Sequence, residues 1–270
     1  MSSANQAQFD QWNAASQART WPKRERVTSG ITPDLLKALA LRPGERIVDI
    51  GSGGGLAAME AAKAVGPVGA VVGFDISAPL TALAKQRAAE ANCANVQFVA
   101  GDAQTEAIPG APFDAAMSQF GVMFFSDPIA AFKNIRGHLR DGGRLAFVCW
   151  QPYDKNKWFP GPVLSPYQPP PPPTEHGGPP PGPFALGDQE YVRGILDGAG
   201  FTGVHIEPFE RDVAIPDDSL VDRELVDGLR VDDATKEKAW ADLQAFRETL
   251  KGPDGMLHFR IAPQIVRASA

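Results

Sequence analysis

A glycine-rich turn with an acidic residue beside it is the clearest chemical motif in the sequence. The segment Val48–Gly55 reads V-D-I-G-S-G-G-G and joins an apolar strand pattern to an alanine-rich helix pattern. Gly51, Gly53 and Gly55 let the backbone turn tightly and approach a ligand closely, and the following helix start offers free N–H groups. Phosphate-binding folds use similar turns, but Asp49 would repel a pyrophosphate and attract an ammonium group.

Two further carboxylates follow at the ends of the next two predicted strands. Asp75 lies in G-F-D-I-S, and Asp102 lies in G-D-A-Q. A carboxylate in the position of Asp75 can accept hydrogen bonds from both hydroxyls of a ribose. Each acid alone could equally be a helix cap or a turn residue. Together with the glycine turn, they favour a nucleoside ligand that also carries a cation.

A parallel sheet would bring these residues to one edge. Between residues 46 and 150, apolar strand patterns alternate with helical patterns, and one more helix and strand follow from Asp188 to Phe209. Such alternation predicts an α/β fold: a Rossmann-like, doubly wound, mostly parallel seven-stranded sheet with helices on both faces.

Three segments fall outside this alternation, and they set the predicted organisation. Residues 1–44 are expected to form an N-terminal helical lid, 45–151 the cofactor-binding core, 188–216 its continuation and 254–270 the last core strand. The proline segment, 152–187, and the acidic insertion, 217–253, leave the carboxyl ends of the fifth and sixth strands, so both should roof one pocket. The run Pro169–Pro173 predicts polyproline II, although composition alone also allows a disordered linker.

Amino-acid composition limits the classes of function that are open to this protein. The 270 residues carry 26 Lys+Arg against 32 Asp+Glu, a net charge of −6, which disfavours nucleic acid as the main partner. No apolar run is long enough for a membrane span, and the start shows no signal-peptide pattern, so we expect a cytoplasmic protein. Two cysteines and four scattered histidines predict neither a disulfide framework nor a metal site.

The motifs together resemble the class I S-adenosylmethionine-dependent methyltransferases, and most closely the group similar to ubiquinone/menaquinone-biosynthesis methyltransferases. The resemblance covers most of the chain. Beyond the glycine turn, it rests on FGVMFFSDP followed by GGRLAFVCWQP, and on WNAASQARTW near the start. It implies S-adenosyl-L-methionine as cofactor, S-adenosyl-L-homocysteine as product and a small-molecule acceptor, and it leaves the oligomeric state open.

The resemblance also implies roles for individual residues. Asp49 and the loop Gly51–Gly55, with Ser52 and Gly53, would face the methionine part of the cofactor. The ribose and adenine would contact Asp75, Ile76, Ser77, Asp102, Ala103 and Gln104. Ser118 and Gln119 would line the methionine end, and Trp12, Asn13 and Arg19 would belong to the lid. The acceptor pocket is expected to include Asn13, Phe120, Phe124, Trp158 and Phe159.

Methyl transfer needs a base only if the acceptor must lose a proton. The candidates are His176 in the proline segment and His258 on the predicted last strand. Two other activities compete with a methyltransferase. Tyr153 and Lys157 have the Y-x-x-x-K spacing of short-chain dehydrogenases, but their surroundings predict a loop rather than the helix this pair needs. A cyclase that uses the cofactor without methylation, or a binding scaffold, would share the same fold.

Overall fold

A seven-stranded sheet forms the centre of the protein. The computed structural model describes residues 3–14, 16–170, 174, 177–220 and 223–270. The strand order is β3-β2-β1-β4-β5-β9-β6, and β9 runs in the direction opposite to the other six strands. The strands are β1 Arg46–Ile50, β2 Ala70–Asp75, β3 Val96–Ala100, β4 Phe113–Gln119, β5 Leu139–Trp150, β6 Thr202–Pro208 and β9 Pro263–Ser269.

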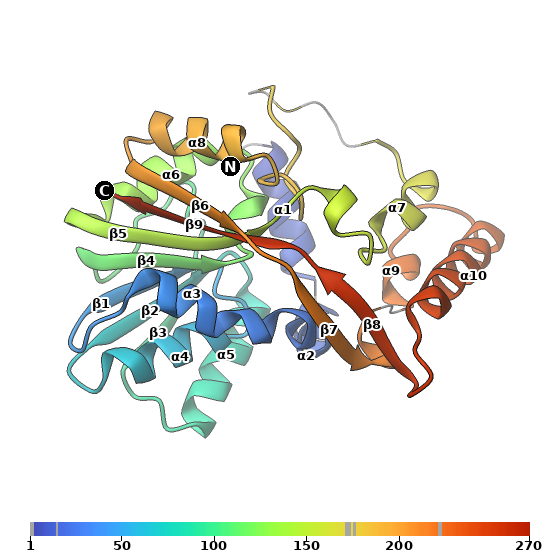
Figure 1. The fold of residues 1–270 in the computed structure, drawn as a ribbon, viewed down its shortest axis with the longest axis horizontal. Coiled ribbons are helices and arrows are strands. Elements are labelled where there is room, and N and C mark those ends of the chain that lie inside the picture. The colour runs from blue at the N-terminus through green and yellow to red at the C-terminus, as the bar shows by residue number, and fades with distance from the viewer. Residues whose placement is uncertain (1–2, 15, 171–173, 175–176, 221–222) are drawn as a thin grey trace.

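Helices cover both faces of this sheet, so the predicted α/β fold is confirmed. Figure 1 shows one group of helices on one face and a second group on the other. The first group is α3 Thr32–Leu39, α4 Leu56–Val65 and α5 Ala78–Glu90, and the second is α6 Pro128–Gly137 and α8 Gln189–Gly198. The central strands are apolar on both sides because both faces are covered; Ile47, Val48 and Phe147, for example, are completely buried.

The register of the parallel strands aligns the ends that carry the predicted site. Asp49 of β1 lies opposite Gly73 of β2 on one side and Met117 of β4 on the other. Asp75, the last residue of β2, lies opposite Ala100 of β3. The carboxyl ends of these four strands therefore share one edge, which is where open α/β sheets bind ligands.

The last segment differs from the single strand that the sequence suggests. It forms two strands, β8 Met256–Ile261 and β9, of which only β9 joins the central sheet. β8 pairs with β7 Arg211–Pro216 in a separate two-stranded sheet that projects from the core (Figure 1). The buried side chain of Asn156 bonds both the N–H and the C=O of Ala262, at 2.9 and 3.0 Å, and so fixes the backbone between the two strands.

The N-terminal segment is helical, as predicted, with α1 Ser3–Trp12 and α2 Ser16–Thr28. The proline segment and the acidic insertion contain the remaining short helices and the longer α10. These are α7 Gly161–Leu164, α9 Glu224–Asp227 and α10 Asp233–Leu250. The 3₁₀ turns are η1 Ser29–Ile31, η2 Val122–Phe124, η3 Tyr153–Lys155, η4 Ser165–Tyr167 and η5 Asp217–Ser219.

The proline segment and the acidic insertion share a small apolar core of their own. Leu164 of α7 packs with Val226, Leu229, Ala239 and Leu243 of the acidic insertion. The two segments therefore support each other on one side of the molecule. The predicted polyproline run lies partly outside the described residues, at 171–173. None of the helices in the described ranges has the length and apolar character needed to cross a membrane.

Candidate active site

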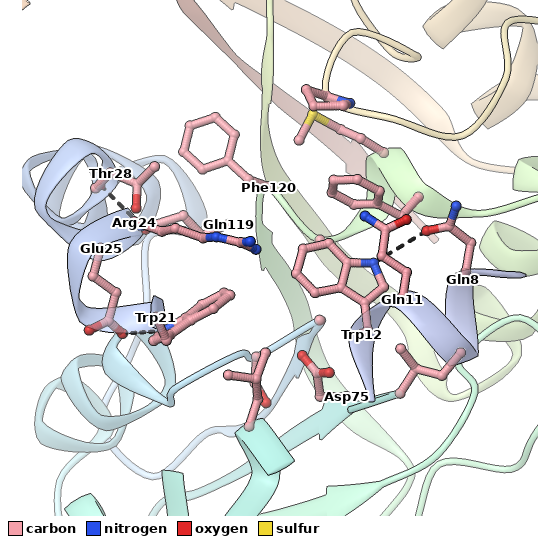
Figure 2. Close-up of a pocket in the computed structure, with 18 of the residues that line it drawn as sticks. Gln8, Gln11, Trp12, Trp21, Arg24, Glu25, Thr28, Asp75, Gln119 and Phe120 are labelled. Atoms are coloured by element: carbon pink, nitrogen blue, oxygen red, sulfur yellow. Dashed lines mark hydrogen bonds between the residues drawn. The ribbon is translucent and has the colours of Figure 1, made fainter. Parts of the chain in front are cut away.

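A cavity of about 620 Å³ opens at the carboxyl ends of β1 to β4. Its floor comes from the loops after these strands, and its roof from the proline segment and the acidic insertion. Both segments contribute lining residues: Trp158, Gln168 and Pro183 come from the proline segment, and Leu220 and Leu225 come from the acidic insertion. Figure 2 shows α1 and α2 facing each other across this space.

Asp49 is the most unusual group in the cavity. Its side chain is 1% exposed, and among the described residues neither carboxylate oxygen has a hydrogen-bond partner. Burial raises the pKa of Asp49 well above its usual range, and the nearby Asp75 carboxylate raises that pKa further. The Ala58 amide acts in the opposite direction but lies outside hydrogen-bond geometry. Because an unpaired buried carboxylate is costly, this site fits a ligand that brings a cationic donor such as an ammonium group.

At Gly51 and Gly53, the glycine turn has no room for a side chain. Gly51 has φ +67°, and a Cβ there would lie 2.7 Å from the Cα of Gly121. The turn after β1 therefore crosses the turn after β4 in direct backbone contact. Gly53 is closed off in another way, since a Cβ on it would lie 2.1 Å from the Trp21 ring of α2. Ser52 lines the cavity, and its buried hydroxyl has no hydrogen-bond partner in the part of the chain that the structure describes.

Asp75 connects the glycine turn to the loop after β2. Its carboxylate accepts hydrogen bonds from the Gly53 N–H at 2.7 Å and the Ser77 N–H at 2.8 Å. Burial raises the pKa of Asp75, while these two backbone donors lower it. Each oxygen can accept a second bond, so Asp75 can still bind ligand hydroxyls from the cavity wall. Ser77 does not line the cavity; it caps α5 and donates to the Trp12 carbonyl at 2.6 Å.

In the loop after β3, some residues line the cavity and others point into the protein interior. Asp102 and Ala103 line the cavity beside Ile76. Asp102 accepts from the Gln104 N–H and the Thr105 hydroxyl, both at 2.9 Å. The Gln104 side chain instead accepts from the Ser126 hydroxyl and the Asp127 N–H. Gln104 therefore supports the loop and is not among the cavity-lining residues.

At the end of β4, only one of the two predicted residues reaches the cavity. Gln119 lines it, accepting from the Thr32 hydroxyl at 2.9 Å and donating to the Thr28 carbonyl at 3.2 Å. Ser118 is completely buried and accepts from the Gly121 N–H at 3.2 Å. Ser118 thus holds the backbone crossing described above.

Four aromatic side chains form an aromatic wall, defined as Phe120, Trp150, Trp158 and Phe159. Phe120 stacks on Trp150 with centroids 4.1 Å apart, Trp158 meets Trp150 edge-on at 5.2 Å, and Phe159 adjoins Trp158 at 6.0 Å. Trp150, at the end of β5, is the member that the sequence reasoning missed. Phe124 also lines the cavity, as predicted, and meets Trp12 edge-on at 5.0 Å.

The N-terminal helices contribute more to the cavity than the sequence suggested. Trp12 lines it as predicted, but Asn13 bonds the Ile76 carbonyl and the Ala78 N–H, and borders only a smaller neighbouring cavity. The residues that were missed lie three or four positions apart on one face of each helix, which is the signal that could have found them. They are Gln8 and Gln11 of α1 and Trp21, Arg24, Glu25 and Thr28 of α2, which Figure 2 labels, together with Val27 of α2.

Of the two predicted bases, only His258 falls within the described residues, and it is not among the residues that line the cavity. His258 lies on β8, its side chain 48% exposed and 2.9 Å from Asp254, and it is not a cavity residue because β8 leaves the central sheet. His176 lies outside the described residues. Within the described ranges, no three His, Cys, Asp or Glu side chains form a group that could hold a metal ion.

Ion pairs connect α2 to the acidic insertion next to Ser219, which lines the cavity. Arg26 pairs with Asp218 at 2.9 Å and donates to the Ser219 hydroxyl at 2.8 Å. Arg19 pairs with Glu224. These pairs are largely solvent-exposed, so each should contribute at most about 1 kcal/mol and weaken in salt.

Sequence comparisons connect the chain to methyltransferases. A family model described as a methyltransferase domain matches residues 47–143. Aklanonic acid methyltransferase of Streptomyces sp. (strain C5) is 36% identical over 105 residues, covering 39% of this chain and 48% of that protein. Nocamycin O-methyltransferase of Saccharothrix syringae is 32% identical over 130 residues, covering 48% of this chain and 46% of that protein. The chain therefore spans about half the length of each of these two enzymes. An uncharacterized protein of Mycobacterium tuberculosis is 30% identical over 209 residues, covering 73% of this chain and 70% of its own.

Solved structures share the fold. A SAM dependent methyltransferase from Aquifex aeolicus superimposes with a TM-score of 0.53 at 19% identity, over 75% of this chain and 92% of its own. The YcgJ protein from Bacillus subtilis does so with a TM-score of 0.58 at 18% identity, over 89% and 98%.

We predict opposite effects of Asp49→Asn on stability and on ligand binding. A carboxyl whose pKa is raised by folding destabilises the free protein as pH rises through that raised value. The variant should therefore melt about 2–4 °C higher than the wild type near pH 7.5, for a gain on the order of 1 kcal/mol. The difference should disappear at low pH, where the wild-type carboxyl is protonated.

The same variant should bind S-adenosylhomocysteine at least about tenfold more weakly by calorimetry, because a charged hydrogen bond is lost. Asp141→Asn, at an exposed position, is the matched control. Unchanged affinity in Asp49→Asn would mean that this carboxylate does not hold the ligand's ammonium group.

We predict that the ion pairs between α2 and the acidic insertion slow ligand release. Arg19→Gln/Arg26→Gln should increase the dissociation rate of S-adenosylhomocysteine about fivefold at low salt, the effect of about 1 kcal/mol from two exposed pairs. High salt should bring the wild type to the same rate in stopped-flow measurements. Arg140→Gln removes an ion pair with Asp114 at the opposite edge of the sheet and should have no effect. A salt-independent wild-type rate would contradict the prediction.

Proposed function

Because the chain belongs to the class I S-adenosylmethionine-dependent methyltransferases, we propose that it methylates a small apolar or aromatic molecule. The methyl donor is S-adenosyl-L-methionine, the nucleophile is an O, N or C atom of the acceptor, and the product is S-adenosyl-L-homocysteine. The single observation that carries this proposal is the unpartnered Asp49 carboxylate, buried in a cavity with an aromatic wall. A cationic cofactor and an apolar acceptor would satisfy these two features together.

The floor of the cavity supports binding of the cofactor. Asp49 would hold the ammonium group of the methionine part, next to the close backbone of Gly51. Asp75 would accept the ribose hydroxyls, with Ile76 against the adenine and Asp102 and Ala103 at its edge. Gln104, Ser77 and Ser118 are proposed as supports of these loops, in keeping with their bonds to backbone and side chains.

The names of the relatives support a small-molecule acceptor. Two of them are aklanonic acid methyltransferase and nocamycin O-methyltransferase, and a third is 2-phytyl-1,4-naphtoquinone methyltransferase of Synechococcus elongatus, 33% identical over 135 residues. The aromatic wall of this chain would suit a flat, apolar acceptor of such a kind.

The catalytic contribution of this chain would be mainly positional. The bound cofactor supplies a methyl group on a sulfonium, which needs no further activation. The aromatic wall and the roof would exclude water and hold the acceptor in line with the methyl group. Residues of the floor would fix the other partner, so two reactants meet in one orientation.

The function is tested by binding and by turnover. We expect calorimetry to show binding of S-adenosylmethionine and S-adenosylhomocysteine and no binding of NAD, since Asp49 opposes a pyrophosphate. We also expect a panel of aromatic acceptors with radiolabelled cofactor to yield labelled product. Binding of NAD alone would refute the cofactor assignment. Acceptor conversion without S-adenosylhomocysteine release would favour the cyclase-like alternative, and binding without any conversion would favour a scaffold.

We predict that the proline segment serves the acceptor and not the cofactor. Replacing residues 169–179 by a short Gly-Ser linker should leave S-adenosylhomocysteine affinity within about threefold, because the proposed cofactor contacts lie after β1 to β4. Methyl transfer should fall at least about tenfold, because shortening the segment would displace Gln168 and Pro183 of the roof. Full activity of the shortened protein would show that this segment is a passive linker.

A further inference from the structure

The loop that follows β3 is held against α6 by a side chain that is not among those lining the cavity. Asn134 lies on α6, and its amide donates to the carbonyl oxygens of Ala103 at 3.0 Å and of Glu106 at 2.7 Å. Within the loop, the N–H groups of Thr105 and Glu106 both donate to the Asp102 carbonyl. One amide group therefore ties both ends of a single turn to one helix.

A second contact holds the loop further along. His138 ends α6, and its Nε2 accepts a hydrogen bond from the Ile108 N–H at 2.9 Å. Its other ring nitrogen, Nδ1, bonds the Asn134 carbonyl at 2.8 Å. Because the Ile108 N–H can only donate, Nε2 must accept and Nδ1 must carry the ring hydrogen. The two residues thus form one connected set of contacts, the α6 clamp, defined as Asn134 and His138.

The helix that carries the α6 clamp is itself fixed in the core. Phe132 of α6 is completely buried, and its ring centre lies 5.4 Å from that of Phe147 on β5 and 6.4 Å from that of Phe201, just before β6. Where α6 begins, the Asp127 N–H donates to the Gln104 side chain at 2.9 Å. The loop after β3 is therefore attached to a well-packed helix, and a rigid element holds a site more precisely than a loop alone.

Ala103 is the cavity residue that Asn134 holds directly. It is 6% exposed, and the proposed function places it at the edge of the adenine. A backbone N–H can donate to N1 of adenine, whereas the same nitrogen of hypoxanthine carries a hydrogen and would oppose that N–H. The direction of the Ala103 backbone would therefore decide which base is accepted, and the Asn134 bond to its carbonyl restricts that direction.

We propose that Asn134, supported by His138, is a positioning residue for adenine recognition. The α6 clamp holds the Ala103 backbone in the orientation that accepts adenine and rejects hypoxanthine. This inference rests on the proposed function. Neither clamp residue lines the cavity, so both act through the loop and not by touching the cofactor. Loss of the clamp should therefore reduce discrimination between the two bases more than it reduces binding in general.

The test compares S-adenosylhomocysteine with S-inosylhomocysteine, which differ only in the base. Calorimetry on the wild type should show the adenine compound binding at least about tenfold more tightly, because the other base leaves a polar group mismatched. Asn134→Leu should bind S-adenosylhomocysteine about five- to tenfold more weakly and S-inosylhomocysteine within about twofold of the wild type, since the second ligand has no bond to Ala103 to lose. An unchanged ratio of the two affinities overturns the proposal.

Two other substitutions of Asn134 separate the hydrogen bonds from the volume of the side chain. Asn134→Asp keeps the size but places acceptor oxygens opposite two carbonyl oxygens, so the ratio should fall at least as far as in Asn134→Leu. Asn134→Ser is too short to reach either carbonyl and should lower the ratio to the same extent, which covers the case that Leu impairs folding. A wild-type ratio in Asn134→Ser would equally overturn the proposal.

Asn95 offers a matched control, because its side-chain amide also donates to two backbone carbonyls. The acceptors are Ala62 and Gly66, each at 2.9 Å, and Asn95 lies just before β3, at the edge of the sheet opposite the cavity. Asn95→Leu should lower the melting temperature by about 2–4 °C, as Asn134→Leu should, but leave the ratio of affinities within about twofold. Equal loss of discrimination in both variants would show general loosening of the protein and refute positioning.

His138 is tested by the same ratio. His138→Leu removes the acceptor of the Ile108 N–H and should lower the ratio about threefold, less than Asn134→Leu, because Ile108 lies further along the loop from Ala103. His205→Leu, at an exposed position on β6, is the matched control and should leave the ratio unchanged. A wild-type ratio in His138→Leu would refute the contribution of His138.

The results for the wild type separate this inference from the proposed function. Failure to bind S-adenosylhomocysteine would refute the proposed function, and this inference with it. Equal binding of the two compounds would leave the cofactor site in place but refute recognition of adenine through Ala103. A preference for S-adenosylhomocysteine that is unchanged in Asn134→Leu would refute the positioning role alone.

Discussion

The buried carboxylate of Asp49, which has no hydrogen-bond partner among the described residues, is the constraint on which the cavity floor depends. It lies on a central strand at 1% exposure, next to a second buried carboxylate, Asp75. Such an arrangement is unfavourable in the protein alone, because burial and like charge both oppose ionisation. A cationic ligand would remove both penalties at once. The stability that the fold loses at this position would then be recovered when a cationic ligand binds.

The rest of the floor holds that carboxylate in place. The backbone of Gly51 crosses that of Gly121 at a distance that excludes any Cβ, and Ser118 bonds the Gly121 N–H. Asp75 links the glycine turn to the start of α5 through two backbone N–H groups. These are short, buried contacts between loops of parallel strands, so the floor is expected to be rigid.

The roof is held together by other kinds of interaction than the floor. It depends on aromatic contacts, a small separate apolar core and exposed ion pairs between α2 and the acidic insertion. Exposed ion pairs are weak and sensitive to salt, which suits a cover that has to open for exchange. Asn156 connects the aromatic wall to the backbone between β8 and β9. Its side chain bonds Ala262 there, and it also accepts a hydrogen bond from the Trp158 indole at 3.0 Å. A stable floor with a weaker roof would let one cofactor site accept different second substrates.

The sequence by itself determined the strand–helix alternation, the glycine turn and the carboxylates at successive strand ends. Each of these is local, since apolar periodicity and turn chemistry are read over a few residues. It also placed Phe120, Phe124, Trp158 and Phe159 in the cavity. Only the tertiary structure decided how distant segments meet: Asn13 bonds the loop after β2, Arg24 of α2 lies over the Trp12 ring of α1, and His258 lies on β8, outside the central sheet. Helical spacing shows that residues share a face, but which face covers a cavity depends on long-range packing that one sequence does not display.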